Sequence, residues 1–302
     1  MSDIKLFRLS DASVTELEGT SVKLEKSIQA LIEQNLEAFL GVRFLNSEHP
    51  TGKTHGGRID TLGLDENGFP VIIEYKRHTD ENVINQGLYY LDWLMDHKGE
   101  FELLVLKTLG QKAADQVVWM GPRLLCIAGD FTKYDEHAVQ QINRNIELIR
   151  YRKFGSDLLL FELVNATTAV DGAEVDGPSK PKRQDTTVTG YLDKADAELT
   201  DRYEALKSFL TGLGDDVQTK TLKYYFAFKR LRNFACVEIH PSTGKLSVYV
   251  KVDPDSIELQ ERFTRDVRNI GHFGTGELEI TIDSDEDLER AEPLLRRSYE
   301  AS

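Results

Sequence analysis

The amino-acid sequence predicts an α/β protein built on a mixed sheet, followed by a smaller α+β domain. Apolar residues recur with helical spacing in some segments and form short strand-like runs in others. The chain has 302 residues, a length typical of about two domains. Hydrophobic residues make up 40% of the chain, which is enough for packed cores and excludes an intrinsically disordered protein.

A flexible linker is predicted over 166–189. This part of the sequence contains Gly172, Gly177, Pro178 and Pro181, many small polar residues and no aromatic residue up to Val188. We therefore expect one domain over 1–165 and a second over 190–302.

The first domain alternates predicted helices and strands. Its elements are a helix over 21–40, strands over 42–45, 58–64 and 69–76, a helix over 81–97, strands over 101–106 and 123–128, a helix near 137–145, and strands near 146–151 and 157–163. Gly41 ends the first helix, and Asp65-Glu66-Asn67-Gly68 is a strong hairpin signal. This order is typical of helices packed on both sides of a mixed sheet.

The second domain is predicted as a compact α+β unit. Its elements are a helix near 197–213, strands over 224–229, 234–240 and 245–252, a helix near 256–267, a strand over 277–282 and a final helix near 285–300. Pro241-Ser242-Thr243-Gly244 is a turn between two of the strands.

Charge and hydropathy exclude several classes of protein. The net charge of −14 argues against a protein that coats nucleic acid through Lys and Arg alone. No apolar run reaches the roughly 20 residues that a membrane span needs, and the N-terminus has no signal-peptide pattern, so we expect a cytoplasmic protein without membrane contact. Cys126 and Cys236 lie in apolar runs and are expected as buried free thiols.

The hairpin places two carboxylates opposite each other. If Gly68 takes the left-handed position of the turn, Asp65 pairs with Phe69 and Asp60 lies opposite Glu74. Opposed residues of an antiparallel pair have Cβ atoms about 5 Å apart on one face. Lys76 shares the face of Glu74 because the side-chain period of a strand is two.

Two carboxylates this close repel each other, and a divalent cation relieves the repulsion. Mg²⁺ or Mn²⁺ on such a pair leaves positions for water and a substrate phosphate, and a lysine can then orient or deprotonate that water. An ordinary salt bridge of Lys76 with Asp60 or Glu74 at a strand end is the structural alternative for this short pattern.

Several motifs together resemble the PD-(D/E)xK nuclease superfamily. They are Gly57-Arg58-Ile59-Asp60, the run from Val71 to Glu74-Tyr75-Lys76-Arg77, Gln86-Gly87-Leu88-Tyr89-Tyr90, Leu24-Glu25-Lys26, and the run from Gly121 to Ala128. The resemblance covers roughly residues 22–163 and is nearest to the nuclease domain of the EndoMS/NucS branch. It implies a restriction-endonuclease-like αβββαβ core and a DNA endonuclease that needs Mg²⁺ or Mn²⁺.

The resemblance also implies a role for each matched residue. Asp60 and Glu74 would bind the metal together with the Tyr75 carbonyl, and Lys76 would be the catalytic lysine. The further catalytic residues would be Gln86 and Glu25, the latter as an outer acidic ligand, and the DNA contacts would be Arg58, Arg77 and Tyr90. Gln86 and Tyr90 lie on one face of the predicted helix and would either support the site or contact DNA. Many members form homodimers, so a homodimer is an expectation. The sequence shows no counterpart of the N-terminal DNA-binding domain of mismatch-specific EndoMS enzymes, so mismatch specificity is not implied.

The second domain carries a basic and aromatic stretch. From Thr219 to Phe234 the sequence interleaves Lys and Arg with Tyr and Phe, which predicts nucleic-acid contacts by Lys223, Lys229 and Arg230. The structural alternative for the same pattern is an ordinary strand whose aromatic residues pack inward and whose charged residues are solvated. The domain resembles a small uncharacterised bacterial module that is often fused to nuclease-like domains, and this names no activity.

Two functions from different classes therefore follow from the sequence. The first is a metal-dependent endodeoxyribonuclease that acts in DNA repair or in defence, with an RNA phosphodiester as a variant substrate. The second is a non-catalytic scaffold that retains the nuclease fold and binds nucleic acid or protein. Divalent-metal binding by Asp60 and Glu74 distinguishes the nuclease from the scaffold, because a scaffold has no need for a metal ion.

Overall fold

The computed structural model describes residues 4–10, 13–20, 25–52, 56–76, 83–169 and 187–302. The chain divides into two compact units, Met1–Ala173 and Glu174–Ser302, here called unit 1 and unit 2. The division falls inside 166–189, the stretch expected as a linker, of which residues 170–186 lie outside the described part of the chain.

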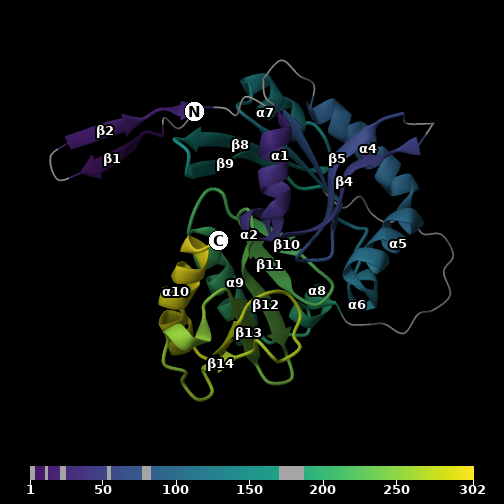
Figure 1. Ribbon diagram of the computed structural model, residues 1–302. Helices are drawn as coiled ribbons and strands as arrows, with labels where there is room; N and C mark the ends of the chain where they lie inside the picture. Colours follow the sequence, from purple (N-terminus) through teal and green to yellow (C-terminus); the bar gives the residue numbers. More distant parts are fainter. Residues whose placement is uncertain (1–3, 11–12, 21–24, 53–55, 77–82, 170–186) are drawn as a thin grey trace. The chain divides into compact units, whose positions relative to one another are not determined.

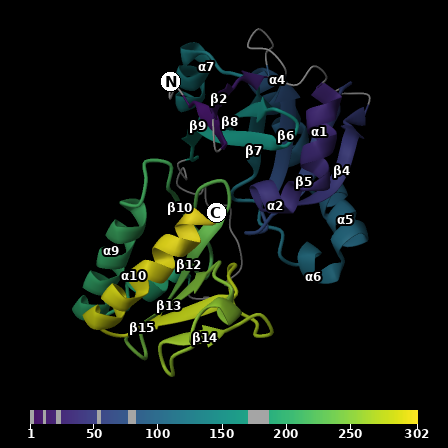
Figure 2. The same ribbon diagram turned by 60° about the vertical axis from the view of Figure 1, so that its left-hand side comes forward.

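Unit 1 is built on a seven-stranded mixed sheet in the order β3-β8-β7-β6-β5-β4, with β9 paired to β8 (Figure 1; strands β4 to β9 are labelled in Figure 2). Strand β6 runs parallel to β7, and β7 runs parallel to β8, whereas the other neighbours are antiparallel. The strands are β3 (Gly19–Thr20), β4 (Val42–Pro50), β5 (Arg58–Asp65), β6 (Pro70–Lys76), β7 (Arg123–Ala128), β8 (Asn145–Phe154) and β9 (Leu158–Thr167).

The helices of unit 1 complete the predicted αβββαβ core. They are α1 (Glu25–Gln34), α2 (Leu36–Leu40), α4 (Val83–Asp96), α5 (Lys98–Leu109), α6 (Gln111–Ala114) and α7 (Lys133–Gln140). Gly41 ends α2 in the left-handed conformation, with φ of 63°. The order α1, then β4, β5 and β6, then α4 and finally β7 confirms the predicted fold class.

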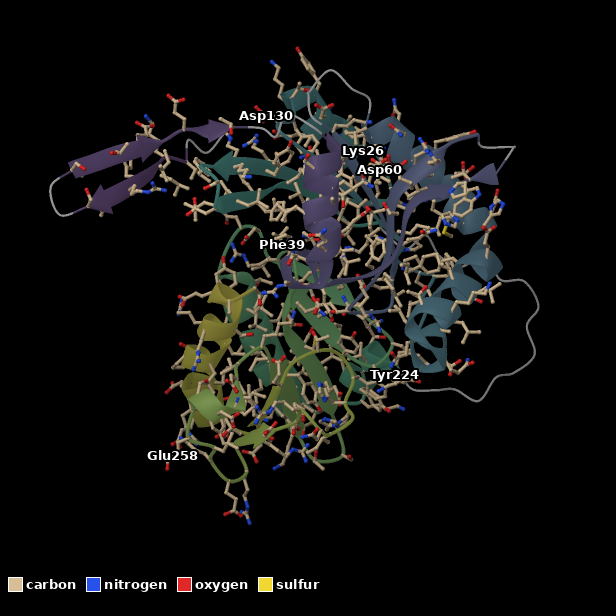
Figure 3. The ribbon with its side chains drawn as sticks, in the orientation of Figure 1. Lys26, Phe39, Asp60, Asp130, Tyr224 and Glu258 are labelled. Atoms are coloured by element: carbon tan, nitrogen blue, oxygen red, sulfur yellow. The ribbon has the colours of Figure 1, made fainter. Side chains whose placement is uncertain are left out.

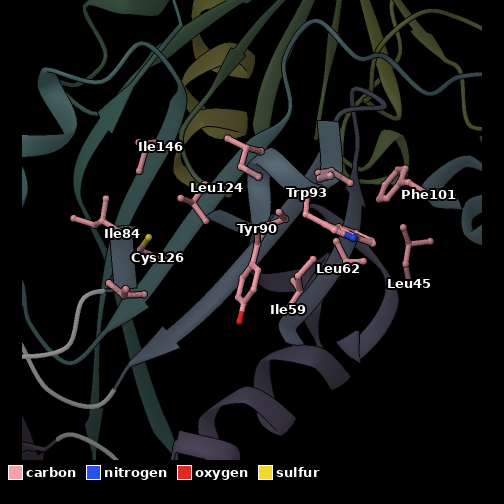
Figure 4. Close-up of a cluster of buried hydrophobic side chains, with 14 of the residues drawn as sticks. Leu45, Ile59, Leu62, Ile84, Tyr90, Trp93, Phe101, Leu124, Cys126 and Ile146 are labelled. Atoms are coloured by element: carbon pink, nitrogen blue, oxygen red, sulfur yellow. The ribbon is translucent and has the colours of Figure 1, made fainter. Parts of the chain in front are cut away.

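The main core of unit 1 lies between the sheet and helices α4 and α5. Leu62 and Ile72 from the hairpin strands pack there with Leu124 of β7 and Trp93 of α4, all at most 2% exposed (Figure 4). Alternate residues of β5 therefore face this core, as the period of two in a strand requires. The two cysteines are buried free thiols, as expected, and Cys126 belongs to this core.

One predicted strand is wrong. The apolar run at 101–106 lies within helix α5, where Phe101 and Val105 are buried at a spacing of four while Leu103 is 48% exposed. A short apolar run fits either a buried strand or a helix, and here the helical spacing of the two buried residues decides it. Sequence analysis also missed the hairpin of β1 (Leu6–Ser10) and β2 (Ser13–Leu17).

Unit 2 is a six-stranded antiparallel sheet in the order β10-β11-β12-β13-β15-β14. Its elements are α8 (Val188–Leu192), α9 (Ala197–Thr211), β10 (Gln218–Thr221), β11 (Phe226–Lys229), β12 (Asn233–His240), β13 (Lys245–Val250), η1 (Pro254–Ser256), β14 (Thr264–Asp266), β15 (Leu278–Ile282) and α10 (Asp285–Glu300). Helices α9 and α10 lie side by side on one face of the sheet (Figures 1 and 2). The helix predicted near 256–267 is wrong, since these residues form the end of η1, a loop and β14.

A buried ion-pair network holds the β5–β6 turn to the parallel strands. Arg123 of β7 donates to Asp65 Oδ2 at 2.8 Å and, through two nitrogens, to both carboxylate oxygens of Glu147 at 2.8 and 2.9 Å. Asp65 also accepts from the backbone N–H groups of Asn67 and Phe69, at 2.9 and 2.8 Å. All three charged side chains are at most 3% exposed. Each charged group thus has hydrogen-bond partners, and removing Arg123 leaves two carboxylates buried together.

Arg123→Ala is expected to destabilise unit 1 by about 3–5 kcal/mol, because it leaves the buried carboxylates of Asp65 and Glu147 without their cationic partner. Urea unfolding followed by a probe in unit 1 measures the loss. Arg144→Ala is the matched control, since Arg144 is exposed and donates only to the adjacent Asn143 carbonyl among the described contacts. Equal stability of the two variants would contradict a structural role for the network.

Candidate active site

The hairpin register is the one that the sequence predicts. Gly68 is left-handed with φ of 82°, and Asp65 N donates to Phe69 O at 2.9 Å. Thr61 pairs with Ile73 and Leu62 with Ile72 across the two strands. One further step along this register sets Asp60 opposite Glu74, on the same face as Leu62 and Ile72.

The carboxylates of Asp60 and Glu74 each accept a hydrogen bond from the backbone of the opposite strand. Asp60 N donates to Glu74 Oε1 at 3.2 Å, and Tyr75 N donates to Asp60 Oδ2 at 3.0 Å. Asp60 is half-buried on β5 (labelled in Figure 3), whereas Glu74 is 0% exposed. Glu74 Oε2 is buried without a hydrogen-bond partner among the described residues. A buried acceptor in this state costs free energy unless another group binds to it.

The environment raises the pKa of Glu74 from 4.5 to about 9. Burial is the largest cause, and the negative charge of Asp60 adds to it. The hydrogen bond from Asp60 N and the charge of Lys76 act in the opposite direction without overcoming burial. With no cation bound, the Glu74 carboxyl therefore holds a proton at neutral pH.

These donors fit a hard divalent cation. Two carboxylates from adjacent strands converge, one of them with an unpartnered buried oxygen that accepts a cation readily. Within the described ranges, no group of three or more His, Cys, Asp and Glu side chains is arranged to hold a metal ion. Among the described residues, further ligands would therefore be backbone oxygens, with water completing the set, and an outer ligand role of Glu25 stays a prediction.

Lys76 and Tyr75 complete the end of β6. Lys76 is half-buried, two residues after Glu74, and its charge acts on the Glu74 carboxyl. Tyr75 is fully buried, and its hydroxyl lies 3.3 Å from Thr61 Oγ1, so its ring occupies the face opposite to Asp60 and Glu74. A Tyr75 metal contact would therefore involve its carbonyl, and this stays a prediction.

Helix α1 supports β5 through two residues that sequence analysis missed. Gln29 Nε2 donates to Asp60 O at 2.9 Å and to Glu33 Oε1 at 3.1 Å, and Glu33 Oε1 lies 2.5 Å from Thr61 Oγ1. The spacing of four from Glu25 through Gln29 to Glu33 is a signal that marks one helix face. Glu25 begins α1, and its side chain lies outside the described residues.

Helix α4 fixes the start of β5 through Tyr90. The Tyr90 hydroxyl accepts from Arg58 N at 3.3 Å and from Gln86 Nε2 at 3.4 Å (Tyr90 in Figure 4). A Cβ at Gly57 would lie 2.5 Å from this hydroxyl, so only glycine leaves room for it. Tyr90 is 6% exposed in the core, and the prediction that it contacts DNA is therefore wrong. Gln86 supports Tyr90, and a catalytic role for Gln86 stays a prediction.

The residues predicted to contact phosphate differ in their exposure to solvent. Arg58 is exposed, and its Nε lies 3.4 Å from Glu48 Oε2, while Arg77 lies outside the described residues. In unit 2, Lys223 is exposed. Lys229 is 2% exposed, so the prediction that it contacts nucleic acid is wrong.

Arg230 is held in place by its neighbours. Its Nε donates to Asp216 Oδ2 at 2.7 Å, and its guanidinium lies 4.6 Å from the ring centre of Tyr299. This ion pair is partly exposed and therefore weak, so a contact of Arg230 with nucleic acid stays a prediction.

Glu74→Gln is expected to remove a pH dependence of folding. Because the pKa of Glu74 is higher in the folded state, its contribution to stability is complete below pH 4.5 and is lost as the pH rises towards 9. In EDTA, wild-type unit 1 should lose up to about 1.4 kcal/mol per pH unit in this range relative to Glu74→Gln. Thermal unfolding from pH 5 to 9 measures this, with the exposed Glu37→Gln as control. Parallel profiles for wild type and Glu74→Gln would contradict a raised pKa of Glu74 in the folded state.

Residues 188–302 match a family model described as a domain of unknown function (DUF5655). An uncharacterised protein of Haemophilus influenzae is 28% identical over 98% of this chain and 99% of its own length. In the described part of the chain, no helix has both the length and the apolar composition to cross a membrane.

Two solved structures are similar to part of the chain. A repair endonuclease from Pyrococcus abyssi is 20% identical over 43% of this chain, with a TM-score of 0.29. A complex of EndoMS with double-stranded DNA is 19% identical over 47% of this chain, with a TM-score of 0.26. The chain covers about half the length of each, 49% in both cases. Function is therefore argued from the residues of the site.

Proposed function

We propose that the chain is a divalent-metal-dependent DNA endonuclease whose active site is formed by Asp60, Glu74 and Lys76. One observation carries the proposal: Glu74 is fully buried beside Asp60, with an oxygen that has no partner among the described residues. Burying a carboxylate in this way is unfavourable for folding, and a cation that ligates both carboxylates removes the penalty.

Each residue has a distinct role in this proposal. Asp60 and Glu74 would hold Mg²⁺ or Mn²⁺, with the Tyr75 carbonyl as a third ligand. The bound cation would activate a water for attack on phosphorus and offset the charge of the phosphate. Lys76 orients or deprotonates the attacking water, or stabilises the charge that develops on the phosphate oxygens.

The electrostatics of the chain support a requirement for a cation. With a net charge of −14, the chain repels a polyanionic substrate at long range. At the site itself, the negative charge of Asp60 adds to this repulsion. A divalent cation reverses the local sign and allows a phosphodiester to approach the carboxylates.

Lys76→Ala and Asp60→Ala are each expected to reduce DNA cleavage at least about 100-fold, since general acid–base and metal contributions are typically this large. The measurement is Mg²⁺- and Mn²⁺-dependent cleavage of supercoiled plasmid, linear duplex, single strand, mismatch, flap and fork. Lys107→Ala, at an exposed lysine of α5, is the matched control and should cut like the wild type.

Two results would overturn the assignment. The first is cleavage that persists in Asp60→Ala, which would place the nuclease chemistry elsewhere. The second is a folded wild type that cuts neither DNA nor RNA and binds no Mn²⁺, which would leave the non-catalytic scaffold. Cleavage of RNA alone would retain the chemistry and change the substrate.

A further inference from the structure

The unit 2 sheet has two chemically different faces. One face is apolar and packs against helices α8, α9 and α10. On the other face, Cys236 lies opposite Tyr249, Tyr249 opposite Glu279, and Glu279 opposite Arg265. A sheet face lined by polar and aromatic side chains, while the opposite face forms the core, is suited to binding a ligand.

Two stacked aromatic pairs lie at this second face. Tyr249 stacks on His272 with ring centres 4.3 Å apart, and Tyr224 stacks on Phe273 at the same separation (Tyr224 in Figure 3). A Cβ at Gly274 would lie 2.6 Å from Cys236 Cβ, so the loop that carries His272 and Phe273 lies directly on the sheet. Phe273 is nevertheless 49% exposed, which leaves part of its ring surface accessible.

A groove of about 580 Å³ lies at the other end of the same face. Its lining includes His240, Lys245, Arg262 and Arg265. Lys245 pairs with Asp283, and Arg265 with Glu279. Arg262 is exposed, has no ion-pair partner among the described residues, and has a left-handed backbone with φ of 67°. This conformation is unfavourable for arginine and is over-represented at functional sites.

A chain of contacts links the aromatic pairs to the groove. Phe273 N donates to Glu238 Oε1 at 3.0 Å, and Glu238 Oε2 lies 3.6 Å from His240 Nε2, which lines the groove. Tyr249, the partner of His272, is the cross-strand neighbour of Glu279, which also lines the groove. One path on this face thus leads from an exposed aromatic ring to an exposed guanidinium.

We propose that this face of unit 2 binds single-stranded nucleic acid. An unpaired base stacks on Phe273, and a backbone phosphate contacts Arg262. Stacking on aromatic side chains needs unpaired bases, because a duplex hides the base faces. Few cations are available here, so stacking rather than charge dominates the affinity. The proposal does not depend on the chemistry proposed for unit 1.

The first test compares three residues at position 273 in the full chain. Binding of fluorescein-labelled single-stranded DNA, single-stranded RNA and duplex DNA is followed by anisotropy in EDTA. Phe273→Leu keeps an apolar side chain but removes the aromatic ring, and we expect it to weaken single-strand binding about tenfold. Phe273→Tyr should bind like the wild type. The affinities for single-stranded DNA and single-stranded RNA, compared with each other, show which of the two this face binds.

The second test concerns Arg262. Arg262→Gly is expected to weaken single-strand binding several-fold and to lower the slope of log K against log salt by about 0.7. Its Tm should not fall, because glycine adopts the φ of 67° without strain. Arg296→Ala, at an exposed arginine of α10 on the helical side, removes the same charge and should bind like the wild type.

The proposal is overturned if the wild type binds no single strand. It is equally overturned if Phe273→Leu and Arg262→Gly bind single strands as tightly as the wild type. In that last case, any binding belongs to another part of the chain.

Discussion

The burial of a single carboxylate, Glu74, is the constraint on which the candidate site depends. Its side chain is enclosed between the hairpin and the parallel strand β7, opposite the second carboxylate Asp60. Burial and like charge raise its pKa to about 9, so at neutral pH it is either protonated or bound to a cation. An apolar residue at this position would pack without this penalty. The proposed metal-binding role of Glu74 would account for a carboxylate at this buried position.

The surrounding fold holds these two carboxylates in register by several independent contacts. Arg123 ties the hairpin turn to β7 and β8, and Tyr90 fixes the first residues of β5 from the core side. From the opposite face, Gln29 binds the Asp60 carbonyl. Support from both faces of the sheet limits the movement of Asp60 relative to Glu74, which a metal site with few protein ligands requires.

The sequence predicted those features that depend on local rules. The turn at Gly68 and the period of two in a strand were sufficient to place Asp60 opposite Glu74. The helix over 101–106 was missed because a short apolar run has no decisive period. Lys229 and Tyr90 were misassigned because composition does not reveal burial, which tertiary packing decides. Gln29 and Glu33 were missed since their role appears only when α1 packs on β5.

Binding of Mn²⁺ itself, measured by calorimetry and by electron paramagnetic resonance on the full chain, tests the proposed metal site most directly. We expect saturable binding that Asp60→Asn and Glu74→Gln each abolish. Glu48→Gln, which alters a carboxylate paired with Arg58 on the adjacent strand, should leave binding intact. At pH 7.5, binding should also release about one proton, because the cation displaces the proton held by Glu74. Mn²⁺ binding that is unchanged in Asp60→Asn and Glu74→Gln, or no binding by the wild type, would contradict the central claim.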